Sequence, residues 1–283
     1  MFARDFEICR LFGIPLVVGF DVVFLMLFIA LSCGNLAWGL LFSLVLVVSV
    51  ILHELGHALT ARLFRVQVRE IRIGMLGGCA ELVGRLWRPG HQVAVSLAGP
   101  LVNLLAAGAL YALALFAPVP PRLAGLLAAA VWTNLVLGGF NLIPGFPLDG
   151  GHALMAVLGR FIHRERAAFA IMCVGRGTAV LLALSWLRVV ARDFDVGALL
   201  LLAAAVLWIA GGRVLPALLR LWMPEGRALM ASLLLRGPLQ LVLGFLGFAL
   251  ASGSVRLWTF NLFVAGSIWQ AAYAAYREAA WHG

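Results

Sequence analysis

The residues most capable of chemistry are two histidines and a glutamate in the segment LHELGHAL. His53 and His57 are four residues apart, and Glu54 lies between them. On a helix, positions i and i+4 share a face, so both imidazoles can reach one ion while Glu54 stands beside it to activate a water. Zinc suits this set, because imidazole nitrogen is a good zinc ligand and the ion lowers the pKa of its water. The spacing predicts a catalytic metal site.

A second segment, NLIPGFPLDGGH, offers a candidate for the third zinc ligand. A catalytic zinc takes three protein ligands and keeps one position open. The segment runs from Asn141 to His152 and contains two prolines and three glycines. Such a composition cannot continue a helix, so we expect the backbone to open here. Asp149 is the favoured third ligand, and His152 is the alternative.

The elements that position these residues belong to a membrane protein. Of the 283 residues, 64% are hydrophobic and 12% are charged, whereas soluble domains have about 25% charged residues. This composition excludes a cytosolic enzyme, an extracellular domain and a disordered chain. The net charge of +9 indicates contact with anionic lipid headgroups rather than with nucleic acid. We expect a multi-pass protein of the cell membrane.

Apolar runs of roughly 20 residues predict the membrane spans. We expect an all-α polytopic membrane protein with about six to eight transmembrane helices. The runs cover residues 14–33, 36–64, 93–116, 124–142, 167–190, 196–222, 238–252 and 255–273. Residues 1–166 are expected to form a catalytic core, and residues 167–283 to add further helices to the same membrane domain.

The distribution of arginine predicts which side of the membrane each loop faces. All 21 basic residues are arginine, and most fall in segments that share one side if the spans alternate. Arg122, Arg188, Arg192 and Arg256 fall on the other side, and Arg176 lies near the inner end of a span. Cytoplasmic loops carry the excess of basic residues. We therefore expect the N-terminus and residues 65–92 to be cytoplasmic.

The cytoplasmic loop 65–92 contains a strand-like segment. Apolar and polar residues alternate around Val66, Val68, Ile71 and Ile73, which is the period of a half-buried strand. Gly77 and Gly78 then predict a turn. We expect a small β-hairpin over residues 66–82 at the cytoplasmic face of the membrane.

Taken together, these motifs resemble the site-2 protease family of intramembrane zinc metalloproteases. The matching stretches are LFGIPLVVG, VSVILHELGHALTARLF, IRIGMLGGCAEL, VSLAGPLVNLL and NLIPGFPLDGGH, in family order between Leu11 and His163. Many members also carry a PDZ domain or a CBS pair. This chain resembles a compact form without either domain.

The resemblance implies one zinc ion per chain, held by His53, His57 and Asp149. It also implies that Glu54 acts as general base and general acid. The residues alone left Asp149 and His152 as candidates for the third ligand. The resemblance implies Asp149.

The resemblance also implies how a substrate is held. Asn141 helps to position the substrate backbone, and the hairpin, with Ile71 and Ile73, adds to an extended substrate as a strand. The expected function is an intramembrane zinc metalloendopeptidase that cleaves transmembrane segments of membrane-tethered proteins. The alternative is a membrane transporter or channel that uses the two histidines and the aspartate for metal transit. The sequence indicates no oligomeric state.

Overall fold

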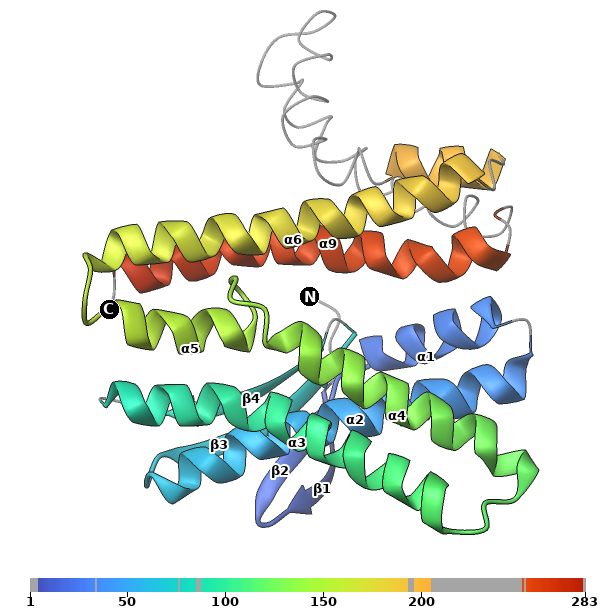
Figure 1. The fold of residues 1–283 in the computed structure, drawn as a ribbon, viewed down its shortest axis with the longest axis horizontal. Helices are drawn as coiled ribbons and strands as arrows, with labels where there is room; N and C mark the ends of the chain where they lie inside the picture. The colour runs from blue at the N-terminus through green and yellow to red at the C-terminus, as the bar shows by residue number, and fades with distance from the viewer. Residues whose placement is uncertain are drawn as a thin grey trace, which may run out of the picture. The chain divides into compact units, whose positions relative to one another are not determined.

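The structure, a computed structural model, describes residues 5–33, 35–75, 77–84, 88–192, 196–204, 251 and 253–281. The fold is mostly helical, with one small sheet (Figure 1). The chain forms two compact units, one of residues 1–178 and 267–283 and the other of residues 179–266. The strands are β1 (Phe6–Leu11), β2 (Ile14–Val18), β3 (Gln67–Gly74) and β4 (Gly77–Val83). The helices are α1 (Asp21–Ser32), α2 (Leu36–Leu63), α3 (Pro89–Phe116), α4 (Pro121–Asn141), α5 (Asp149–Leu158), α6 (Arg164–Arg192) and α9 (Gly253–Trp281).

Four helices in the described part of the chain are long and apolar enough to cross a membrane. They are α2, α3, α4 from Leu123, and α6. With a rise of about 1.5 Å per residue, the 28 residues of α2 span roughly 42 Å, which exceeds the hydrocarbon core of about 30 Å. These four helices match four of the predicted runs. Helix α9 covers the run 255–273 but is not among the four. The run 238–252, apart from residue 251, and most of 196–222 lie outside the described residues.

The first predicted run, residues 14–33, is not a single helix. Residues Ile14–Val18 form strand β2, and only Asp21–Ser32 are helical. The 12 residues of α1 extend for roughly 18 Å, too short to cross the bilayer core. The strand forms because the segment pairs on both sides, with β1 and with β3. The membrane-span prediction for these residues is therefore corrected to a strand followed by a short apolar helix.

The predicted hairpin is present as β3 and β4, and it belongs to a larger sheet. The strand order is β1-β2-β3-β4. Strands β2 and β3 are parallel, while the other two pairs are antiparallel. The sheet buries Ile14, Leu16, Ile71 and Ile73 in a cluster with Ala58 of α2 and Val22 of α1. This packing fixes the sheet against the helix that carries the two histidines.

The chain opens between α4 and α5, as the prolines and glycines of this segment predict. Helix α4 ends at Asn141 and α5 begins at Asp149. Phe146 in the opened segment is fully buried against Met155 of α5 and Ile171 of α6. The break thus places Asp149 on the first turn of a new helix. The apolar cluster around Phe146 packs against that helix.

Two further packing features concern the last described helices. Within the first unit, the Arg176 guanidinium of α6 lies 4.7 Å from the centre of the Trp269 ring and 5.5 Å from that of Tyr273, both on α9. This cation–π contact provides a partner for the Arg176 charge between two largely apolar helices. The second unit has its own core, formed by Trp186, Val190, Ala198, Leu201, Ala251 and Leu262.

Helix α3 yields a test of topology. Its 28 residues connect Arg88 to the start of α4, so positions 88 and 122 should lie on opposite sides of the membrane, with 88 cytoplasmic. Single cysteines at Arg88 and Arg122, in a variant whose four native cysteines are replaced by serine, should react with a membrane-impermeant thiol reagent from opposite sides. Labelling of both from the same side would contradict the span assignment.

Candidate metal centre

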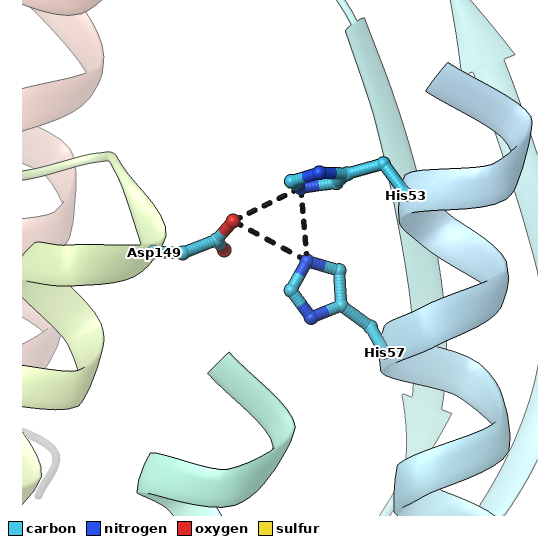
Figure 2. Close-up of side chains that lie close together, drawn as sticks. All are labelled: His53, His57 and Asp149. Atoms are coloured by element: carbon cyan, nitrogen blue, oxygen red, sulfur yellow. Dashed lines mark hydrogen bonds and ion pairs between the residues drawn. The ribbon is translucent and has the colours of Figure 1, made fainter. Parts of the chain in front are cut away.

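The two histidines of α2 and Asp149 of α5 converge on one point. His53 and His57 are buried, at 5% and 9% exposure, on consecutive turns of α2. Their Nε2 atoms lie 3.1 Å apart, and the Asp149 Oδ2 lies 3.0 Å and 3.3 Å from them (Figure 2). These are the three groups that could hold a metal ion together. Sequence reasoning named all three.

The spacing of the three ligand atoms fits a zinc ion. Donors bound tetrahedrally at about 2.1 Å stand roughly 3.4 Å from one another, close to the observed separations of 3.0–3.3 Å. Two imidazole nitrogens and one carboxylate oxygen also form a donor set typical of catalytic zinc. A set of three protein ligands leaves the fourth position for water or substrate.

The second nitrogen of each histidine is hydrogen-bonded, which fixes how each ring faces. His57 donates from Nδ1 to the Val95 carbonyl oxygen of α3 at 2.6 Å. His53 donates from Nδ1 to the Asn103 side-chain oxygen, also at 2.6 Å. With Nδ1 protonated in both rings, both Nε2 atoms carry the lone pair that a metal needs.

Glu54 lies beside this group and against the sheet. Its side chain is 7% exposed, and its carboxylate lies close to the backbone of Ala80 in β4. Gly78 of the same strand lies so close that a Cβ there would come within 2.8 Å of the Glu54 carboxyl. The strand therefore packs directly on the candidate general base, a contact that sequence reasoning did not anticipate.

Gly99 of α3 is a second residue that sequence reasoning missed. A Cβ at this position would collide with the His57 ring and come within 2.8 Å of the His53 Nε2. Only glycine lets α3 approach the ligands this closely. A signal was present in the sequence, because Gly99 and Asn103 are four residues apart and share one face of the helix.

His152 and Asn141 were also predicted as site residues, and neither belongs to the three-residue metal group. His152 packs against the Phe146 ring, with ring centres 5.1 Å apart. Asn141, at the end of α4, donates to the Leu137 carbonyl oxygen of its own helix.

Ile71 and Ile73 lie in the interior of the sheet rather than at its edge. Their side chains are 0% and 2% exposed. Ile71 pairs with Leu16 on one side and Ala80 on the other, and Ile73 pairs with Val18 and Gly78. A substrate strand cannot add to β3 beside them while these pairs are formed. The edge strand on the side of the metal group is β4, so the expected strand addition moves from β3 to β4.

Comparison with known proteins gives a consistent family. The Peptidase family M50 model matches residues 41–120 and 120–184. A zinc metalloprotease of Methanocaldococcus jannaschii is 34% identical over 178 residues, which is 62% of this chain and 52% of that protein. Stage IV sporulation protein FB of Bacillus subtilis is 30% identical over 142 residues, 50% of this chain and 48% of that protein. The chain thus spans about half the length of these relatives.

A solved structure is similar as well. The site-2 protease from Methanocaldococcus jannaschii aligns with a TM-score of 0.54 and 29% identity, covering 66% of this chain and 85% of that one. The M50 match extends over the histidine pair, the helix that carries Gly99 and Asn103, and the opened segment with Asp149. The chain belongs to peptidase family M50, the site-2 protease family.

Proposed function

We propose that this protein is an intramembrane zinc metalloendopeptidase that hydrolyses peptide bonds in transmembrane segments of membrane-tethered proteins. The observation that carries the proposal is the buried group of His53, His57 and Asp149, with Glu54 beside it on a helix long enough to cross a membrane. The relatives named as zinc metalloproteases support the same activity. No finding favours metal transport.

In this proposal the chain's own residues divide the work. The two imidazole Nε2 atoms and the Asp149 carboxylate hold the zinc ion, which when bound supplies a Lewis acid that polarises the substrate carbonyl and lowers the pKa of a water molecule. The Glu54 carboxylate takes a proton from the attacking water and delivers it to the departing amine nitrogen, so it returns to its starting state. The backbone of β4 packs against this carboxylate at Gly78.

A peptide bond within a helix is shielded, so the substrate has to be extended at the point of cleavage. Strand β4 offers the place, because it is the last strand of the sheet on the side of Glu54. An extended peptide can add to such an edge through main-chain hydrogen bonds. Ile71 and Ile73 support this edge from the neighbouring strand, and Asn141 would position the substrate backbone where α4 ends.

The setting of the reaction follows from the helices. The protein would act in the cell membrane. The arginines of residues 65–92 favour a cytoplasmic position for the β3–β4 hairpin, and the pairing of β2 with β3 places the N-terminal strands beside it. Its partners would be the lipid bilayer and a membrane-tethered protein substrate.

The metal assignment predicts one zinc per purified chain. The His53→Ala, His57→Ala double variant and the Asp149→Ala variant should lose it, because fewer than three protein ligands remain. His152→Ala is the matched control, since this histidine is close in sequence but outside the metal group. Elemental analysis of the detergent-purified proteins measures the result. Equal zinc in the double variant, or loss of zinc in His152→Ala, would overturn the ligand assignment.

The role of Glu54 predicts a variant that binds metal but does not cleave. Glu54→Gln should keep its zinc and lower the cleavage rate by roughly 10²- to 10⁴-fold, because the amide cannot accept the proton. Glu165→Gln, at an exposed position on the first turn of α6, is the control and should cleave normally. Cleavage of a reconstituted membrane substrate is the measurement. A normal rate in Glu54→Gln would remove this residue from the mechanism and leave transport as the better function.

The role of β4 predicts a different response to proline and to alanine at one position. Leu82 lies near the end of β4, where it pairs with Val68 of β3. Leu82→Pro removes one main-chain amide from this edge strand. We expect cleavage to fall roughly 2- to 10-fold, the value of one main-chain hydrogen bond, while Leu82→Ala stays near normal. Zinc content should be unchanged in both variants. Equal cleavage by the two would place the substrate elsewhere.

A further inference from the structure

Three buried polar side chains connect α2, α3 and α4 immediately behind His53. Ser49, Asn103 and Asn134 are 2%, 0% and 3% exposed, and each belongs to a helix that is a candidate membrane span. Intramembrane amides that bond between helices are a common packing device. The contacts of these three residues, however, continue to a metal ligand.

The direction of every hydrogen bond in this network is determined by backbone carbonyls. Asn103 donates from Nδ2 to the Ser49 carbonyl oxygen at 3.0 Å and to the Asn134 Oδ1 at 2.8 Å. Asn134 donates from its own Nδ2 to the Ala130 carbonyl oxygen and to the Ser49 hydroxyl, both at 2.9 Å. The Ser49 hydroxyl donates to the Val45 carbonyl oxygen at 2.8 Å. A carbonyl oxygen only accepts. If either side-chain amide were rotated by 180°, its own oxygen would face a backbone carbonyl oxygen, and no hydrogen bond could form there.

This fixed direction determines the protonation of the His53 ring. The Nδ2 group of Asn103 is used by Ser49 and Asn134, so its Oδ1 is the atom that faces His53 Nδ1 at 2.6 Å. The oxygen can only accept, hence Nδ1 must carry the proton and Nε2 the lone pair. The same Nε2 lies 3.0 Å from the Asp149 carboxylate.

We propose that Asn103 is a positioning residue for the metal centre, and that Asn134 and Ser49 hold it so that His53 presents Nε2 to the ion. The proposal rests on the proposed zinc site and is independent of proteolysis. It gives α4 a role at the metal centre, although that helix contributes none of the three metal ligands. His57 needs no such residue, because its Nδ1 is satisfied by a backbone carbonyl.

The test compares two nearly isosteric replacements of Asn103 in the full-length protein in detergent. Asn103→Leu removes the acceptor for Nδ1, whereas Asn103→Asp keeps one, in the carboxylate–histidine–metal arrangement found in many zinc sites. Both variants lose the two donors to Ser49 and Asn134, so the pair isolates the acceptor. The zinc dissociation constant is measured by competition with a chelator. The visible spectrum of the Co²⁺-substituted protein reports the ligand geometry, and thermal unfolding reports stability separately.

We expect Asn103→Leu to weaken zinc binding by about 10- to 100-fold and to change the Co²⁺ spectrum. Asn103→Asp should lower thermal stability, because its second oxygen faces two acceptors, but should weaken zinc binding less than Asn103→Leu. Wild-type affinity in Asn103→Leu, or an equal loss in Asn103→Asp, would overturn the positioning role. A wild-type protein that binds no zinc would instead refute the zinc site itself.

A serine pair covers the case in which Asn103→Leu does not fold. Ser49 and Ser43 are both buried serines of α2, and each donates to a carbonyl oxygen of its own helix. Only Ser49 contacts Asn103 and Asn134. Ser49→Ala should weaken zinc binding several-fold, and the matched control Ser43→Ala should leave it unchanged. Equal affinities in the two serine variants would contradict the proposal.

Discussion

Polar groups on an apolar helix need partners within the protein, and this requirement governs the surroundings of α2. A group left unsatisfied in hydrocarbon costs several kcal/mol. Helix α2 carries His53, Glu54 and His57 in a largely apolar sequence, and each has a different structural neighbour. The Asn103 side chain and the Val95 carbonyl accept hydrogen bonds from the two histidines, and the backbone of β4 packs against Glu54. The positions of α3 and β4 are thus tied to the site's chemistry.

The same requirement explains why small residues surround the site. Partners can reach a helix's side chains only if the backbones come close, and glycine permits the closest approach. Gly99 brings α3 against both imidazoles, and Gly78 brings β4 against the Glu54 carboxyl. A methyl group at either position would force the histidines or the glutamate out of place. The close packing of α3 and β4 on α2 therefore also sets the positions of these side chains.

The histidine pair and the helix break before Asp149 could be predicted because each of these two patterns is local. Two histidines at i and i+4 must share a helix face, and the prolines before Asp149 must break a helix. The long apolar helices were also predictable from length alone. The strand at Ile14–Val18 was not, since a continuous apolar run does not distinguish a buried strand from part of a membrane span. Its identity depends on pairing with β3, which follows more than 50 residues later.

The partners of the site residues could not be predicted for a related reason. Asn103 and Asn134 bond to each other between α3 and α4. That Asn103 also faces His53 depends on the rotation of α3 against α2, which periodicity does not specify. The position of β4 over Glu54 depends likewise on how the sheet docks on the helix. Local pattern thus identified the candidate ligands, while tertiary packing determines which atom of each candidate faces the others.

The placement of the candidate base between a rigid helix and a sheet edge has a consequence for substrate choice. Glu54 belongs to α2, yet its carboxylate packs against the backbone of β4, the strand proposed to bind substrate. Pairing at that edge uses main-chain groups, which every extended peptide offers in the same way. Selection among substrates would then depend less on their side chains than on the free energy of unwinding a transmembrane helix beside β4. Helix-breaking residues such as glycine and proline lower that cost, so a segment that contains them near the cleavage point would be favoured over a uniformly leucine-rich one.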